Sequence, residues 1–96
     1  MHRALTSNES RMMLLLGSQK RVYLGDVAHL MRVSISTSHM LRRSLESKGL
    51  LRSSKEISFA DNYVARHCVL SPTDRGRKIA ERLEVISGLI MEKESQ

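Results

Sequence analysis

Polar and basic side chains recur at helical spacing between residues 35 and 48, opposite the apolar side of a predicted helix. They combine hydroxyl, imidazole, thioether and guanidinium groups, from Ser36, His39, Met40 and Arg43, with Thr37 and Arg42 at the flanks. Hydroxyl and guanidinium groups hydrogen-bond phosphate oxygens and base edges, and methionine can touch a thymine methyl group. This chemistry fits the major groove of DNA. A solvated helix face without a ligand is the alternative interpretation.

A short helix precedes this face, and the two together predict a helix-turn-helix over about residues 26–48. Val27, Leu30 and Met31 have the spacing of one buried face of a short helix. Val33 would fill the turn. Ser34 is placed to cap the second helix with its side-chain oxygen, and we count it among the DNA-contacting residues.

The second helix is predicted to run from about Ile35 to Lys48. Ser38, Leu41 and Leu45 follow at steps of three and four, which makes them its inward face. Gly49 supplies the left-handed residue that ends such a helix.

After Gly49 the hydrophobic period changes to about two, which predicts a β-hairpin over about residues 50–70. Ala60, Asp61 and Asn62 have the composition of a turn. The loop length is open between two and three residues. We favour three, because that register pairs Phe59 with Tyr63 as aromatic neighbours across the strands.

This hairpin is predicted to be polar toward its tip, so it should project from the domain as a wing. Arg52, Lys55 and Arg66 are predicted to contact the DNA backbone, because cationic side chains bind phosphate oxygens. Asp61 at the tip would meet phosphates, which argues against deep insertion into a groove.

The stretch VSISTSHMLRRSLESKGLL resembles the recognition helix of winged helix-turn-helix regulators. LSPTDRGR resembles the junction between wing and helix in their MarR-like branch. The resemblance covers roughly Val22 to Leu83. Arg32 stands where a turn glycine is common, and Ser38 and Arg42 stand where aliphatic residues are common. The resemblance implies an α+β, mainly helical fold, with a three-helix core, a β-hairpin wing and a long C-terminal helix, and it implies binding of double-stranded DNA.

Two terminal helices carry more apolar side chains than a three-helix core can cover. The first is predicted to have Ser7 or Asn8 as its N-cap, and Met12 to Leu16 are five consecutive apolar residues that cannot share one face. The second, over about residues 74–92, has Thr73 as its predicted N-cap. We predict a homodimer interface formed by Met12, Leu16, Ile79, Leu83, Ile86, Leu89 and Ile90. Pairing through terminal helices is also what the resemblance implies.

The 96 residues suffice for one small domain, which we place over residues 1–96. The net charge of +6 favours an anionic partner, although basic charge alone indicates nucleic acid only weakly. Cys68 is the only cysteine, so no intrachain disulfide forms. No apolar run is long enough to span a bilayer, and the first ten residues contain no signal-peptide core. We therefore expect a cytoplasmic protein without a membrane partner.

The sequence predicts no enzyme, no metal site and no cofactor. It contains no phosphate-binding glycine loop, and His67 and Cys68 would point to opposite faces of a strand, so they cannot chelate together. Two alternatives to a DNA-binding regulator stay open, an interaction module that does not bind DNA and a ligand- or redox-responsive sensor. The short chain does not favour a roomy pocket for a small-molecule effector, and a partly buried structural role is favoured for Cys68.

Overall fold

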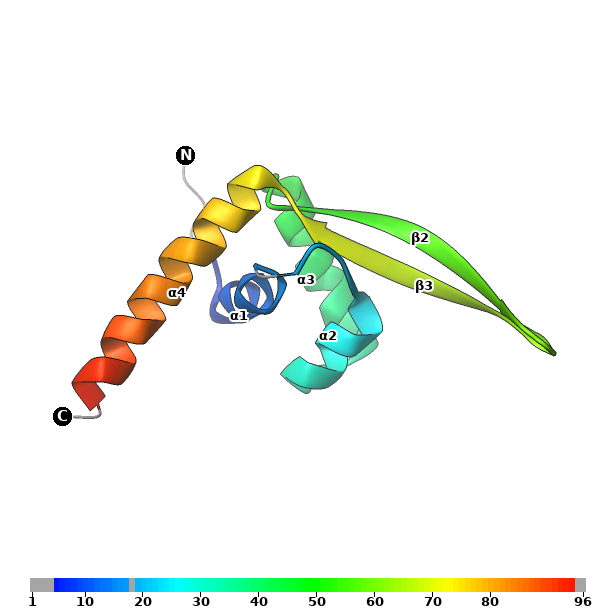
Figure 1. Ribbon diagram of the computed structural model, residues 1–96, viewed down its shortest axis with the longest axis horizontal. Coiled ribbons are helices and arrows are strands. Elements are labelled where there is room, and N and C mark those ends of the chain that lie inside the picture. Colours follow the sequence, from blue (N-terminus) through cyan, green and yellow to red (C-terminus); the bar gives the residue numbers. More distant parts are fainter. Residues whose placement is uncertain (1–4, 18, 95–96) are drawn as a thin grey trace.

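The hairpin and the C-terminal helix leave a helical centre on opposite sides of the molecule (Figure 1). The computed structural model describes residues 5–17 and 19–94, and the side chains among these up to residue 86. In chain order the elements are α1 (Ser7–Leu16), β1 (Val22–Tyr23), α2 (Leu24–Met31), α3 (Ile35–Ser47), β2 (Leu51–Ala60), β3 (Tyr63–Pro72) and α4 (Asp74–Glu94). This is the α+β, mainly helical winged helix-turn-helix that the sequence predicts. We call β2 and β3 together the wing.

The first helix begins one residue earlier than predicted, because its N-cap is Thr6 and not Ser7 or Asn8. The Thr6 hydroxyl accepts a hydrogen bond from the Glu9 backbone N–H at 3.1 Å, and the Glu9 carboxylate accepts one from the Thr6 N–H at 3.0 Å. Threonine followed three residues later by glutamate is a capping box. The sequence contains this threonine–glutamate spacing, but the prediction did not use it.

The helix-turn-helix has the predicted order with one shifted boundary. α2 begins at Leu24, so Gly25 lies inside its first turn, whereas the sequence predicted a start at Asp26. Arg32 takes the left-handed conformation (φ 58°) between the two helices, a conformation that glycine adopts without a steric penalty. Ser34 caps α3 as predicted, accepting from the Thr37 N–H at 3.1 Å.

The end of α3 also follows the prediction. Gly49 has φ +73°, and the Leu50 N–H donates to the Leu45 carbonyl at 3.0 Å. This left-handed residue turns the chain directly from α3 into β2.

The core lies where α1, α2, α3 and the base of the wing meet. Its buried members are Met12, Met13, Leu16, Leu24, Val27, Met31, Leu45, Leu50, Leu51 and Leu70. Ser38 is also fully buried, and its hydroxyl donates to the Ile35 carbonyl at 2.7 Å, which satisfies it without leaving the helix. Of the run from residue 12 to 16, only Leu15 is exposed, so this domain covers most of that surface by itself.

Within the described residues, the strands form an antiparallel sheet in the order β1-β3-β2. Ala60 pairs with Tyr63 and Phe59 with Val64, so Asp61 and Asn62 alone form the loop. The favoured three-residue loop was therefore wrong. The polar tip was also wrong, because Ile57, Phe59, Tyr63 and Val64 are exposed apolar side chains there.

The last helix starts against the base of the wing. The Thr73 hydroxyl accepts from the Gly76 N–H at 3.0 Å, as expected of an N-cap, and donates to the Gly49 carbonyl at 2.7 Å. A Cβ at Gly76 would lie 1.9 Å from the Leu50 carbonyl oxygen. Glycine is therefore needed where α4 passes the wing.

Candidate nucleic-acid interface

The outward face of α3 is open to solvent at three of the predicted positions. Met40 is 68% exposed, and Ser36 and Arg43 are also exposed. Among the ion pairs of the described residues, none includes Arg43. Its guanidinium is therefore available to a phosphate or a guanine edge.

The N-terminal turn of α3 adds hydroxyl groups and one residue that the sequence reasoning missed. Ser34 donates to the Thr37 hydroxyl at 3.0 Å while capping the helix, so the two hydroxyls hold each other in place. His39 is half-buried beside this turn. Ile35 is exposed at the start of the helix, where an apolar group can meet a base methyl. Ile35 lies four residues before His39, so the two share one face of α3, a relation visible in the helical spacing.

Arg42, predicted at the flank of the outward face and among the DNA-contacting residues, instead points toward the wing. Its side chain is only 16% exposed, and its Nη1 donates to Glu46 Oε2 at 3.0 Å and to Ser53 Oγ at 3.4 Å. Ser53, which belongs to β2, also hydrogen-bonds Glu46. Arg42 therefore holds α3 against the wing instead of facing a ligand.

A second charge cluster holds the C-terminal end of α3 against α1. Glu9 is buried, and its Oε2 accepts from Lys48 Nζ at 2.6 Å and from Ser44 Oγ at 2.8 Å. Burial by itself would raise the pKa of this carboxyl. The hydrogen bonds from Lys48, Thr6 and Ser44 outweigh burial and lower the pKa from 4.5 to about 2. Glu9 is therefore ionised at neutral pH.

The predicted wing cations are exposed but divide between two faces. Lys55 pairs with Cys68 and Ile57 with Arg66, so Lys55 and Arg66 share the face that begins against α3. Arg52 pairs with Ser71 and lies on the other face. Only Lys55 and Arg66 can therefore meet the same stretch of backbone as α3.

The opposite face of the wing is fastened to β1. The Tyr23 ring stacks on His67 with centroids 4.7 Å apart, and its hydroxyl donates to Glu56 at 3.4 Å. Arg21 forms an ion pair with the same carboxylate. These contacts join both strands of the wing to β1 and to Arg21 just before it.

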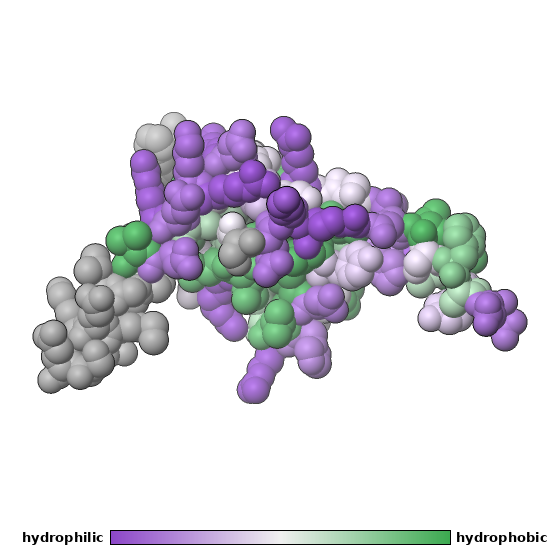
Figure 2. All heavy atoms as spheres, in the orientation of Figure 1, coloured by the Kyte–Doolittle hydropathy of each residue, from purple (hydrophilic) through white to green (hydrophobic). Residues whose placement is uncertain are grey.

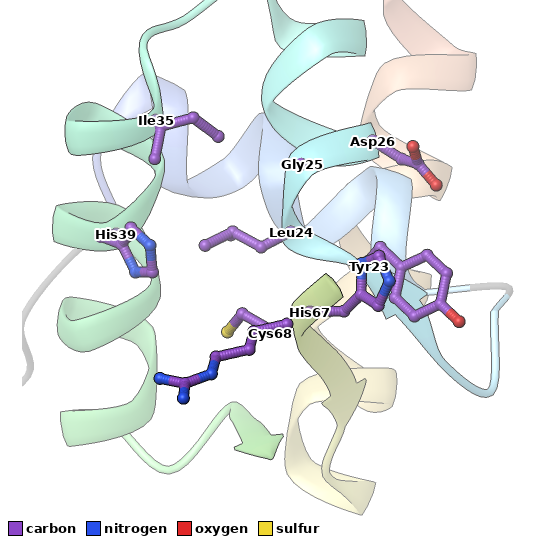
Figure 3. Close-up of a pocket in the computed structure, with 9 residues that line it drawn as sticks. Tyr23, Leu24, Gly25, Asp26, Ile35, His39, His67 and Cys68 are labelled. Carbon is purple, nitrogen blue, oxygen red and sulfur yellow. The ribbon is translucent and has the colours of Figure 1, made fainter. Parts of the chain in front are cut away.

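A hollow of about 320 Å³ joins α3 to the wing (Figure 3). Ile35 and His39 of α3 lie on one side of it, and His67 and Cys68 of β3 lie on the other. Leu24 at the start of α2 lines the hollow between them, and Arg66 also contributes. The hollow thus connects α3 with the base of the wing, where Cys68 and Arg66 share a face with Lys55.

Cys68 is half-buried at this hollow. Burial raises the pKa of its thiol, which keeps the sulfur protonated at neutral pH. The environment is that of a packed strand residue, the role favoured from the sequence. Among the described residues, no cluster of His, Cys, Asp and Glu could hold a metal ion. In the same part of the chain, no helix combines the length and apolarity needed to cross a bilayer.

The predicted dimer residues separate into three groups. Met12 and Leu16 are fully buried in the core of the single chain, so they have no surface to offer a partner and that part of the prediction is corrected. Ile79 and Leu83 are half-buried against the same core. Ile86 is 54% exposed on α4, next to the exposed Val85, which was not predicted. The side chains of Leu89 and Ile90 lie outside the described residues.

No protein-family model matches the sequence, and no curated protein is significantly similar to it. Solved structures do match the fold. The adhesin competence repressor AdcR of Streptococcus pyogenes has a TM-score of 0.78 at 20% identity, over 95% of this chain and 63% of that protein. FabT of Streptococcus pneumoniae, solved in complex with DNA, has a TM-score of 0.73 at 24% identity, over 93% and 59%.

A third match is BpsR of Bordetella bronchiseptica, whose DNA binding is regulated by 6-hydroxynicotinic acid. Its TM-score is 0.73 at 21% identity, over 93% of this chain and 64% of BpsR. The chain therefore spans less than two thirds of each of these proteins. The chain has the winged-helix fold of these proteins, and the resemblance in the sequence predicted that fold.

Proposed function

We propose that this chain binds double-stranded DNA with sequence preference, as a homodimeric transcriptional regulator. The observation that carries the proposal is the free outward face of α3, where Ser36, Met40 and Arg43 are exposed together. A helix with such a face fits the major groove, and its side chains can read base edges there.

The wing is proposed to position the protein without reading sequence. Lys55 and Arg66 face the same side as α3 and would lie over the phosphates that border its groove. The net charge of +6 supports electrostatic docking on any duplex before specific contacts form.

A titration of two variants tests this division of roles. Arg43→Ala should cost about 1–3 kcal/mol on a site selected from random DNA and relax the preference at one or two base pairs. Arg66→Ala should weaken selected and scrambled duplexes alike and reduce the log–log salt slope by about one unit. Both variants are measured on both duplexes at two salt concentrations. Wild-type protein that binds no duplex at low salt would refute the proposal.

The dimer is proposed to form through α4, around the exposed Val85 and Ile86. Two copies would present two α3 helices, so the preferred site should be a near-palindrome with half-sites about one helical turn apart. Ile86→Glu should dissociate the dimer in sedimentation without unfolding the chain, because Ile86 is half-exposed in one copy. A wild-type monomer at micromolar concentration would remove the dimer from the proposal.

The hollow between α3 and the wing supports a second candidate, a regulator whose DNA binding responds to a small ligand. Its volume of about 320 Å³ lies at the lower end of the range for ligand pockets. Arg66 and His39 line it, so aromatic acids and phenols are the class to try. A rise in melting temperature that His39→Ala abolishes would support this candidate.

A further inference from the structure

The outer half of the wing carries an apolar face that the proposed function does not use. Phe59 is 80% exposed, and its cross-strand partner Val64 and its near neighbour Ile57 are also exposed. In Figure 2 a hydrophobic patch lies near the end of the wing, between hydrophilic atoms at the outermost tip and polar surface on the side of the domain. Contiguous exposed apolar side chains mark contact surfaces.

This face continues the surface that α3 begins. Side chains two residues apart on a strand point to the same side, so Ser53, Lys55, Ile57 and Phe59 follow one another along β2. Ser53 contacts Arg42 of α3. Moving outward from α3 along this face, the wing presents first Ser53, then the cation Lys55, and then the apolar Ile57 and Phe59. Arg66 lies opposite Ile57 on the neighbouring strand.

The spacing of these groups matches the grooves of a duplex. Phe59 lies six residues beyond Ser53, which at roughly 3.3 Å per residue is about 20 Å. The centres of neighbouring major and minor grooves are half a helical turn apart, about 17 Å for a turn of about 34 Å. With α3 in the major groove, Lys55 and Arg66 would lie over the intervening phosphates, and Phe59 would reach the next minor groove.

A protein partner fits this patch less well than DNA does. A typical interface needs about 800 Å² from each partner. Three side chains on a narrow hairpin supply roughly a few hundred Å² at most. A wedge between two base pairs needs only one or two apolar side chains, and phenylalanine, isoleucine and similar residues are used in this way by minor-groove binders.

We infer that Phe59, supported by Ile57 and Val64, inserts as an apolar wedge into the minor groove flanking each α3 site and partly unstacks one base step. The inference rests on the proposed DNA-binding function. The proposed wedge is formed by side chains on one face of the hairpin and not by its loop. Asp61 lies in the loop, beyond the inserted residues. The preferred site then includes a flexible step that no polar side chain reads, because deformable steps unstack at lower cost.

The probe is a duplex selected from random DNA, with 2-aminopurine placed in turn at each flanking position. Wild-type protein should raise the fluorescence at one step in each flank, because unstacking relieves quenching of this base. Phe59→Ala should abolish the rise and weaken binding roughly tenfold, since loss of an aromatic–base contact costs about 1–3 kcal/mol. Replacing a TA step at that position by AA should weaken wild-type binding and leave Phe59→Ala unchanged.

Tyr63→Ala is the matched control. Tyr63 is an aromatic residue at the same end of the wing, 66% exposed, but it pairs with Ala60 and so lies on the other face. This variant should keep the fluorescence rise and the preference for the TA step. Phe59 and Tyr63 are both outside the core, so melting temperatures of both variants should stay near that of the wild type.

Three outcomes overturn the inference, and they are distinguishable. Wild-type protein that binds the selected duplex without any fluorescence rise removes the wedge and leaves the proposed function intact. If Phe59→Ala binds DNA normally but loses a self-association seen in wild-type sedimentation, the patch is a protein interface. If the wild type binds no duplex at all, the proposed function fails, and the wedge fails with it.

Discussion

The outward face of α3 and the outer half of the wing are both proposed to contact DNA, yet they are built in opposite ways. α3 presents polar and cationic side chains and is held from behind by two charge clusters, Glu9 with Lys48 and Arg42 with Glu46. The outer wing presents apolar side chains. Within the described residues, its outermost side-chain ties to the rest of the domain are those of Glu56.

The difference fits two kinds of contact. Hydrogen bonds to base edges require side chains held within a fraction of an ångström, which demands a rigid support. Phosphate contacts and an apolar wedge depend on reach and exposure, so a projecting hairpin is sufficient. Removing the supports of α3 should therefore cost much more than removing comparable contacts of the wing.

The largest effect is expected at Glu9. Glu9→Ala leaves Lys48 without its buried partner, and breaking a buried ion pair costs about 3–5 kcal/mol, with the lower end expected because Lys48 is not fully buried. The matched variant in the wing is Glu56→Gln, whose partner Arg21 is exposed, and it should cost less than about 1 kcal/mol. Urea denaturation measures both, and equal losses would contradict the comparison.

Lowering the pH should weaken the same interaction between Glu9 and Lys48. The pKa of Glu9 is lowered on folding to about 2, so its contribution is complete above the unfolded pKa near 4.5 and is lost as the pH falls toward 2. A shift of this size corresponds to roughly 3 kcal/mol. The free energy of unfolding should fall more steeply over this interval for the wild type than for Glu9→Gln. Parallel pH profiles would show that the Glu9 carboxylate is not stabilised by its partners.

Two adjacent arginines of α3 should separate support from contact. Arg42→Ala leaves Glu46 and Ser53 without their shared donor and should reduce stability by about 1–3 kcal/mol. Arg43→Ala removes an exposed side chain and should change stability by less than about 0.5 kcal/mol. Urea denaturation of the two variants side by side provides the test. If Arg42→Ala keeps wild-type stability and loses only DNA affinity, Arg42 contacts DNA and does not support α3.

The smallest effect is expected where the wing meets the hollow. Cys68→Ser should bind DNA like the wild type, and mild oxidants should alter neither protein, because burial keeps the thiol protonated. Binding titrations before and after peroxide treatment measure this. An oxidant-dependent loss of affinity in the wild type alone would instead support the redox sensor.

Interactions between residues close together in the chain made the ends of several helices predictable. Ser34 and Thr73 as caps, and Gly49 as the left-handed end of α3, depend on partners a few residues away or on the backbone of one residue. The Thr6 cap was equally local and was missed only because Ser7 and Asn8 are also good caps. The ion pair of Arg42 with Glu46, four residues apart in α3, is also local, but it was not predicted.

The hairpin shows where local chemistry stops. An aromatic pair favoured the three-residue loop, but the register found pairs Phe59 with Val64. β1 pairs with β3, and Tyr23 stacks on His67 from a distance of 44 positions in the chain, so contacts far from the loop share in fixing that register. A shift of one residue would place Tyr63 instead of Val64 beside Phe59, so the register decides which side chains of β3 share the face of Ile57 and Phe59.

The sequence by itself therefore determined the helix-turn-helix, its caps and the hairpin after it, because these depend on periodicity and on neighbours in the chain. Only the tertiary structure decided which cations stay exposed and which are held in ion pairs. Lys48 is taken by Glu9, 39 positions earlier, while Arg43 keeps an open face. It likewise placed Met12 and Leu16 in the core and not at a partner. These outcomes depend on how separate elements pack against each other. The residue pattern of one helix does not show which side chains of another element will lie opposite it.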